Sequence, residues 1–391
     1  MANTVKPVRR PAVPHFSSGP CAKRPGWSPE VLKNAYVARS HRAKAPLARL
    51  QSLIEKSKAL LGLPPDYLLA IMPGSDTGAF EAALWSMLGA RGVDVLAWEN
   101  FGKTWATDVV KQLKLEDARV LEAPYGELPD LGAVDFARDV VFAWNGTTSG
   151  VRVPDGSWIP AGRQGLAFVD GTSAAFAQEI DWPKVDVLTY SWQKALGGEA
   201  QHGMLVLSPR AVARLESYTP PWPLPKVFRL TKNGKLDRTI FAAETINTPS
   251  MLCVEDHHDA LDWAERIGGG KSLTARADAN AAALSRWVER TPWIEHLARD
   301  PRTRSNTSVC LKIADPAVAR LDKDGQAAFV KRLAGQLESE GVAYDIAGHR
   351  EAPPSLRIWC GTTVETSDIE ALCPWLDWAF VEAKHELAKA A

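Results

Sequence analysis

The sequence lacks several features that would assign the chain to a membrane or a polyanion-binding class. No run of about 18 apolar residues occurs, so we expect no transmembrane helix. The formal net charge is zero, with 46 basic and 46 acidic residues, so we expect no nucleic-acid partner, although a local basic pocket is allowed. The first twenty residues carry basic side chains but no apolar stretch, which argues against a secretory signal.

Cysteine is also scarce, with five residues, none of them in a CxxC pair. The odd number and scattered positions favour neither a disulfide framework nor a zinc knuckle, and we expect a reduced, cytoplasmic setting. His257 and His258 lie in a run of acidic and histidine residues, but neighbours on a helix face apart, so we expect no metal site. The segment 268–272 resembles a P-loop, but Glu265 stands where that motif needs its first glycine.

What the chain does contain is the pattern of a large α/β protein. It has 391 residues, 46 % apolar and 24 % charged, which is enough for one large and one small domain. Short apolar runs that end in polar loops occur at 139–150, 165–174, 185–194 and 203–209. Runs of consecutive apolar residues are typical of strands buried on both faces. We therefore predict an α/β fold whose sheet is mostly parallel and lies between helices.

The pattern of apolar residues, prolines and glycines also predicts the order of the secondary-structure elements and the domains. We expect a strand at 67–72 and an amphipathic helix in 79–88, where apolar residues follow the helical period. Helices over 28–61 would break near Pro46, and a helix at about 251–267 would stop at Gly268–Gly270. We predict an N-terminal arm (1–26), a large domain (27–255) and a smaller C-terminal α/β domain (256–391).

Two residues at predicted strand ends point to one cofactor. Ligands bind outside the carboxyl ends of parallel strands, and Asp170 and Lys194 each follow such a strand. Pyridoxal phosphate needs a lysine for a Schiff base, a carboxylate at its pyridine nitrogen and a phosphate cradle. Gly74 and Gly78 in "PGSDTGAF", at the start of a helix, would suit that cradle. Each feature alone also has an ordinary structural explanation. Lys194 could be a solvated lysine, Asp170 a turn residue, and the glycine-rich loop the usual start of a helix.

Five ordered segments carry a resemblance to a known family. They are "HFSSGPCAKRP" (15–25), "SHRAK" (40–44), "WQKALG" (192–197), "INTPS" (246–250) and "GHREAPPSLRIW" (348–359). Together they resemble the phosphoserine aminotransferase family, whose members are class V, fold-type I pyridoxal-phosphate enzymes. The resemblance extends from about residue 15 to the C-terminus. It implies a fold-type I large domain with a smaller C-terminal domain.

The resemblance implies a cofactor role for specific residues. Lys194 would form the Schiff base and later move the α-proton of the substrate, and Asp170 would pair with the pyridine nitrogen. Trp105 would stack on the ring, and Thr147 would bind its phenolic oxygen. The phosphate would be held by Ser75, Asp76, Thr77 and Gln193, and by Asn247 and Thr248 of the partner subunit in a homodimer.

The resemblance also implies how a substrate would be held. The phosphate group of the substrate, as distinct from that of the cofactor, would be bound by His41, Arg42, His349 and Arg350. Arg357 would bind the α-carboxylate, and a guanidinium can do so with two parallel hydrogen bonds. One departure concerns the cradle, because many family members have an arginine where this chain has Thr77, with acidic Asp76 beside it.

The resemblance predicts a homodimeric enzyme that moves an amino group between glutamate and 3-phosphohydroxypyruvate by a ping-pong mechanism. The products would be O-phospho-L-serine and 2-oxoglutarate, in serine biosynthesis, with a possible side role in pyridoxine biosynthesis. Two alternatives stay open. One is another fold-type I enzyme, such as an alanine–glyoxylate-type aminotransferase or a cysteine desulfurase. The other is a protein without cofactor that uses the fold for interactions.

Overall fold

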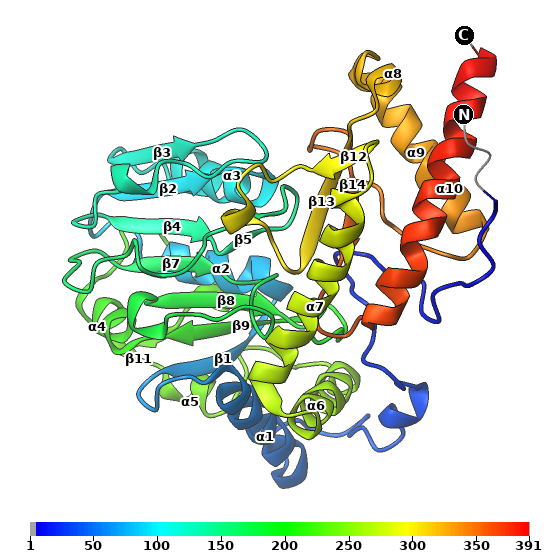
Figure 1. Cartoon of the computed structure of the whole chain (residues 1–391). Helices are drawn as coiled ribbons and strands as arrows, with labels where there is room; N and C mark the ends of the chain where they lie inside the picture. The colour runs from blue at the N-terminus through cyan, green and yellow to red at the C-terminus, as the bar shows by residue number, and fades with distance from the viewer. Residues whose placement is uncertain (1–4, 391) are drawn as a thin grey trace.

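A seven-stranded sheet forms the centre of the large domain in this computed structural model, which describes residues 5–390 (Figure 1). Its strands are β1 (Leu68–Pro73), β2 (Val93–Ala97), β3 (Ala118–Glu122), β4 (Asp139–Ala143), β7 (Ala167–Asp170), β8 (Val187–Ser191) and β9 (His202–Leu207). They lie in the order β1-β9-β8-β7-β4-β2-β3. Only β9 runs antiparallel to its neighbours, so the prediction of a mostly parallel sheet is confirmed.

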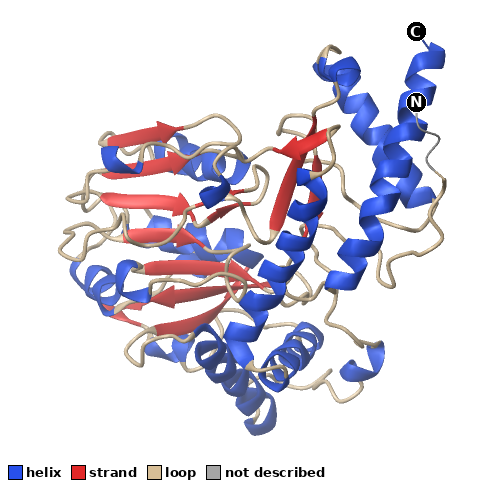
Figure 2. Cartoon of the chain, viewed as in Figure 1, coloured by secondary structure: helices blue, strands red, loops and turns tan. Residues whose placement is uncertain are grey.

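Helices cover both faces of this sheet (Figure 2). They are α1 (Lys44–Leu61), α2 (Ser75–Met87), α3 (Asn100–Thr107), α4 (Pro209–Ser217), α5 (Arg238–Phe241) and α6 (Met251–Arg266). Side chains of a strand alternate between faces, so Leu69 and Ile71 join a core with α1 and α6. Ala70 and Met72 join the opposite core, with α2 and α4. Two buried faces explain the continuous apolar runs.

The C-terminal part builds a second layer of helices on a small antiparallel sheet. It comprises α7 (Gly269–Glu289), β12 (Ile294–His296), β13 (Ser308–Ile313), α8 (Pro316–Ala319), α9 (Lys323–Ser339), β14 (Leu356–Trp359) and α10 (Thr366–Ala390). Short strand pairs β5 (Asn145–Gly146) with β6 (Val151–Arg152), and β10 (Thr231–Lys232) with β11 (Lys235–Leu236), complete the strands. The small sheet has its own core. Along α7, Ala277 belongs to the large core and Ala283 to the small one. The division at residue 255 stays a prediction.

Two local predictions have different outcomes. The break near Pro46 is wrong, because Pro46 lies in the first turn of α1, where a proline removes no helical hydrogen bond. Between residue 5 and the start of α1, the one described helical segment is a short 3₁₀ turn at Pro29–Leu32. The stop after α6 is confirmed, since α6 ends at Arg266 and Gly268 has φ +108° before α7 begins.

The N-terminal arm connects the two domains, and residues 1–4 of it lie outside the described part. The backbone of Pro14 accepts a hydrogen bond from Tyr344 N (2.9 Å), and that of Phe16 accepts one from Trp359 N (3.0 Å). Cys21 N then donates to Gln193 O at 2.9 Å, in the loop after β8. Among the described helices, none combines the length and the hydropathy needed to cross a bilayer.

Candidate active site

Three of the predicted site features, Asp170, Lys194 and the glycine-rich turn, lie at the carboxyl edge of the large sheet. Strands β4, β7 and β8 are parallel, so the residues that follow them lie along one edge. Strand β1 is antiparallel to β9, and β9 is antiparallel to β8, so β1 ends at the same edge. Gly74 and helix α2 follow directly. Asp170, Lys194 and the glycine-rich turn therefore come from neighbouring strand ends, as the sequence predicts.

Asp170 is held by two N–H donors. Its Oδ2 accepts from Trp105 Nε1 at 3.0 Å, and its Oδ1 accepts from Thr172 N at 3.0 Å. The residue is only 7 % exposed. Trp105 itself is buried and packs edge-on against Phe80, with ring centroids 4.7 Å apart. These contacts orient the carboxylate, because two donors from different elements leave it little freedom. The stacking of Trp105 on a cofactor ring stays a prediction.

Lys194 is 9 % exposed, and its Nζ donates to Ser18 O at 2.5 Å. Burial lowers the pKa of this amine, and the charge of Arg357 lowers it further, against the opposing effects of Cys21, Asp170 and Asp76. The N-terminal arm fits closely here, since a Cβ on Gly19 would lie 2.5 Å from Nζ. The lysine is thus an enclosed amine rather than a solvated stem.

Hydroxyl groups from two domains surround Thr147. Its Oγ1 lies 2.7 Å from Ser173 Oγ, which also accepts from Asn145 Nδ2 at 2.9 Å. The backbone oxygen of Thr147 accepts from Ser308 Oγ of the small domain at 2.6 Å. Neither Ser173 nor Ser308 was predicted from the sequence. The sequence could have indicated Ser173, because it follows Asp170 by only three residues. Nothing in the sequence indicates Ser308, which reaches Thr147 only through the packing of the two domains.

The start of α2 has the geometry of an anion cradle. Gly74 has φ +81° and Ser75 has φ +59°, and a Cβ on Gly78 would lie 2.1 Å from Pro73 O. The first-turn N–H groups of a helix have no partner inside it and attract anions. Gln193 Nε2 donates to Ser75 Oγ at 3.3 Å, so the lysine segment lies against this turn.

Two neighbours in that turn differ in where their side chains lie. Thr77 is exposed at the surface of the turn. The carboxyl group of Asp76 is buried beside Asp170. A contact between Asp76 and a phosphate would therefore come from its backbone N–H.

The residues predicted to hold the substrate are only partly brought together. Arg357 on β14 is half-buried, and its Nε has no hydrogen-bond partner within residues 5–390. His349 is half-buried near Phe101, with ring centroids 6.1 Å apart, and burial, then Arg357, lowers its pKa. Arg350 is 88 % exposed and pairs with Glu351 at 3.4 Å. In this conformation Arg350 points to solvent and not to the site.

The other predicted histidine–arginine pair, His41 and Arg42, lies outside the group formed by Asp170, Lys194 and Arg357. His41 is buried, and its Nε2 has no partner among the described residues. Arg42 is exposed and lines a cavity of about 440 Å³ with Lys226, Arg229 and Lys232. Of the predicted site residues, only Arg42 lines it within residues 5–390. A meeting of the two pairs therefore stays a prediction that calls for a second subunit.

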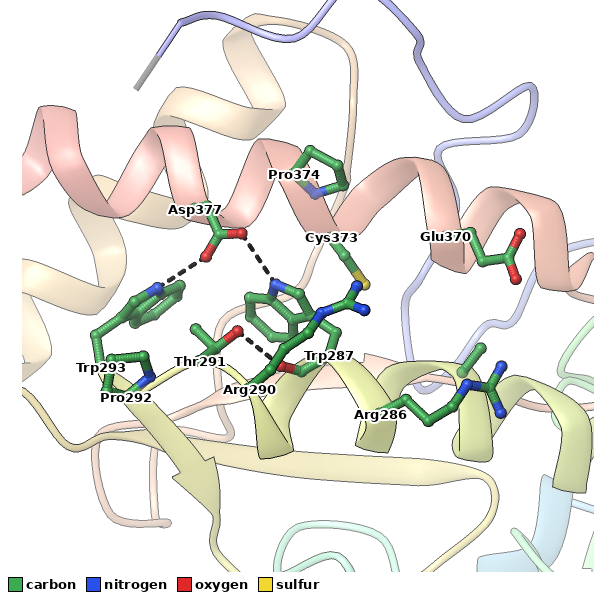
Figure 3. A pocket seen from close by; sticks show the side chains of 11 residues that line it. Arg286, Trp287, Arg290, Thr291, Pro292, Trp293, Glu370, Cys373, Pro374 and Asp377 are labelled. Atoms are coloured by element: carbon green, nitrogen blue, oxygen red, sulfur yellow. Dashed lines mark hydrogen bonds between the residues drawn. The ribbon is translucent and has the colours of Figure 1, made fainter. Parts of the chain in front are cut away.

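A different cavity, of about 560 Å³, lies between α7 and α10 of the small domain (Figure 3). Trp287 Nε1 and Trp293 Nε1 both donate to the carboxylate of Asp377, at 3.1 Å and 2.9 Å. None of the predicted site residues lines this cavity in the described part of the chain. Its volume therefore does not mark it as the site of the chemistry, and the Asp377 contacts tie the two helices together.

Comparison with known proteins assigns the chain to a family. The phosphoserine aminotransferase of Methanosarcina mazei is 57 % identical over 376 residues, which cover 96 % of this chain and 99 % of that protein. A putative phosphoserine aminotransferase of Mycolicibacterium paratuberculosis is 26 % identical over 377 residues, covering 94 % of this chain and 95 % of that protein. None of the protein-family models compared with the chain matches it.

Solved structures share the fold. The phosphoserine aminotransferase structure from Cytophaga hutchinsonii has a TM-score of 0.77 at 18 % identity, over 93 % of this chain and 97 % of that one. An alanine–glyoxylate aminotransferase from Nostoc has a TM-score of 0.75 at 18 % identity, over 96 % and 97 %. The fold alone thus does not separate these two activities, but the identity to the first relative does. The chain belongs to the phosphoserine aminotransferase family.

Proposed function

We propose that this chain transfers the amino group of glutamate to 3-phosphohydroxypyruvate, giving 2-oxoglutarate and O-phospho-L-serine, with pyridoxal phosphate as cofactor. The observation that carries the proposal is the enclosed amine of Lys194 at the same sheet edge as the doubly hydrogen-bonded carboxylate of Asp170. Family membership supports the substrate class, since the relatives are named for phosphoserine.

The residues present fit pyridoxal phosphate. Within residues 5–390, buried polar atoms without a hydrogen-bond partner include Gln193 Oε1 and Arg357 Nε. Gln193 precedes Lys194 in the chain, and the charge of Arg357 acts on the Lys194 amine. The turn before α2 offers backbone N–H groups to a phosphate. Asp170 offers a carboxylate to a protonated ring nitrogen. The cofactor supplies an electron sink for the carbanion character that develops at the substrate α-carbon.

The chain's own groups would then do the binding and the proton transfer. A lowered pKa leaves more of the Lys194 amine neutral near pH 7, and only the neutral amine can accept the α-proton. The contacts from Trp105 and Thr172 keep Asp170 aligned throughout. The planar guanidinium of Arg357 can donate two parallel hydrogen bonds to a carboxylate, so it suits the α-carboxylate of the substrate. Each role is proposed.

A second subunit would complete the site. Asn247 and Thr248 are exposed, which agrees with a role in binding the phosphate of a partner's cofactor. Arg42, with three further basic residues on its cavity wall, would bring positive charge to a distal phosphate of the partner's substrate. We propose a homodimer on this basis. The cytoplasmic location and the pyridoxine side role stay predictions.

The test is amino transfer from phosphoserine to 2-oxoglutarate by wild type and by the Lys194→Ala variant. We expect wild type to prefer phosphoserine strongly over alanine and serine, and the variant to lose nearly all activity while keeping its circular-dichroism spectrum. Lys184→Ala is a matched control. The Nζ of Lys184 donates a hydrogen bond of 2.5 Å to Ile159 O, and this bond lies away from the site. Full activity of Lys194→Ala would refute the mechanism, and a preference for alanine would favour the alanine–glyoxylate alternative.

A further inference from the structure

A run of four polar residues, 305–308, is buried where the small domain meets the large one, and the proposed function does not use it. The first three residues precede β13 and the fourth begins it. All four, here called the polar segment, are at most 5 % exposed: Ser305, Asn306, Thr307 and Ser308. Burying polar side chains costs free energy unless each finds a hydrogen-bond partner. The partners therefore decide which part of the large domain the segment binds.

Every residue of the polar segment donates a hydrogen bond to a backbone oxygen of the large domain. The four bonds are Ser305 N to Gly150 O (2.9 Å), Asn306 Nδ2 to Ala177 O (2.9 Å), Thr307 Oγ1 to Ser173 O (2.9 Å) and Ser308 Oγ to Thr147 O (2.6 Å). The acceptors belong to the loops that follow β4 and β7, and β7 ends at Asp170. A Cβ on Gly150 would lie 2.9 Å from Cys310 N, so β13 lies directly against this edge.

Ser308 also contacts the N-terminal arm. Its hydroxyl has one hydrogen, which it donates to Thr147 O, so it accepts in the 3.3 Å contact with Ser18 Oγ. The backbone oxygen of Ser18 accepts from Lys194 Nζ at 2.5 Å. One hydroxyl group thus connects the loop of Thr147 with the residue that holds the lysine amine.

The bonds of the Ser308 hydroxyl have no good substitute nearby. Ser308 and Ser18 are 0 % and 1 % exposed. Without that hydroxyl, Thr147 O keeps, among the described residues, the contact from Cys310 Sγ at 3.8 Å, and a thiol is a weak donor. A buried polar group that loses its partner costs more than the bond contributed. The Thr147 loop and the arm would therefore move to find other partners.

The same strand also places the proposed carboxylate site. Cys310, two residues after Ser308 on β13, is the register partner of Arg357 on β14. Because the two strands are paired, the attachment of β13 to the large domain also determines where Arg357 lies relative to Lys194.

We propose that Ser308 is a positioning residue whose hydroxyl fixes the Thr147 loop and the N-terminal arm relative to each other. It thereby sets where the Thr147 hydroxyl and the Lys194 amine meet the cofactor. This inference rests on the proposed roles of Thr147 and Lys194. The other three residues of the polar segment hold the start of β13 against the same edge.

The first test compares Ser308→Ala with Ser86→Ala. Ser86, in the last turn of α2, is 3 % exposed and its Oγ donates to Phe228 O at 2.8 Å, so both variants lose a buried hydroxyl bound to a backbone oxygen. In the holoenzyme, a displaced Thr147 hydroxyl no longer stabilises negative charge on the phenolic oxygen. The pH midpoint of the cofactor's visible absorbance should therefore rise by about 0.4 to 1 unit in Ser308→Ala. It should not change in Ser86→Ala.

The second test follows the lysine amine in the apoprotein. Acetylation of Lys194 by acetic anhydride, measured by mass spectrometry of its peptide, should be several-fold faster in Ser308→Ala, because Ser18 O no longer holds the amine in place. Ser18→Ala keeps that backbone oxygen but removes the donor to Ser308, so it should also speed acetylation while leaving the holoenzyme midpoint close to wild type. Ser308→Cys keeps a weak donor of similar size and should restore part of both properties. Ser86→Ala should react at the wild-type rate.

Three results would overturn the inference. They are an unchanged midpoint in Ser308→Ala, a wild-type acetylation rate in both Ser308→Ala and Ser18→Ala, and changes of equal size in Ser86→Ala, which would show a general loss of packing. The acetylation needs no cofactor. A wild-type protein that binds no pyridoxal phosphate would therefore refute the proposed function, while the acetylation rates would still test the connection from Ser308 to Lys194.

Discussion

Replacing Trp105 by Phe should weaken cofactor binding by a predictable amount. The change keeps an aromatic ring against Phe80 but removes the N–H that donates to Asp170 Oδ2 at 3.0 Å. A hydrogen bond to a charged group contributes about 1.5–3 kcal/mol. Since about 1.4 kcal/mol is a tenfold change, the dissociation constant of pyridoxal phosphate should rise about 10- to 100-fold.

Trp287→Phe is the matched control for this prediction. Trp287 is also buried, and its indole N–H also donates to a carboxylate, that of Asp377 at 3.1 Å (Figure 3). Both changes therefore remove the same kind of bond and a similar volume. Trp287→Phe should lower the free energy of unfolding by about 1–3 kcal/mol without changing cofactor affinity.

The assay is equilibrium dialysis of the apoproteins against pyridoxal phosphate, with urea unfolding of the same samples. Unchanged affinity in Trp105→Phe would refute the idea that the indole N–H orients Asp170. An equal loss of affinity in Trp287→Phe would show that the effect comes from general destabilisation. Either result would remove the main geometric support for Asp170 as the ring-nitrogen partner.

Three further changes test the structure elsewhere. Asp186→Ala leaves the nearly fully buried guanidinium of Arg163 without its carboxylate at 2.8 Å, so urea unfolding should show a loss of about 3–5 kcal/mol. Gly19→Ala places a Cβ 2.5 Å from Lys194 Nζ, which would push the amine aside, so borohydride should trap much less cofactor on the protein. Burial lowers the pKa of His202 to about 4, so below pH 6.5 the unfolded state binds a proton at this residue that the folded state does not. His202 should therefore lower the stability by about 1.4 kcal/mol per pH unit from pH 6.5 towards 4, and His202→Asn should reduce the slope of the measured pH dependence by that amount.

Controls for the first two changes lie at the surface. Asp300→Ala removes an ion pair with an exposed arginine, and because water screens an exposed pair it should lower the free energy of unfolding far less than Asp186→Ala does. Gly335→Ala adds a Cβ with no atom within 4 Å, so cofactor trapping should not change. Equal losses in Asp186→Ala and Asp300→Ala would contradict the buried-pair argument. Normal trapping in Gly19→Ala would show that the arm moves aside.

Local pattern alone was enough to predict the sheet and which polar residues follow its strands. Apolar runs at consecutive positions require burial on both faces, which implies helices on both sides. The polar residues after each run, such as Asp170 and Lys194, then have to lie at one edge, because parallel strands end together. Where the prediction erred, at Pro46, the reason was also local, since a proline in a first helical turn looks in sequence like a break.

The neighbours of each functional group were decided by tertiary packing. Ser18, 176 residues before Lys194 in the chain, reaches the amine only because the arm crosses from the small domain. Asp76 was predicted as part of a phosphate loop, yet its carboxyl group turns towards Asp170 because α2 packs over β8 and β9. Residue type and spacing determine which chemistry is available along the chain, whereas burial, charge and hydrogen-bond partners arise only when distant segments meet.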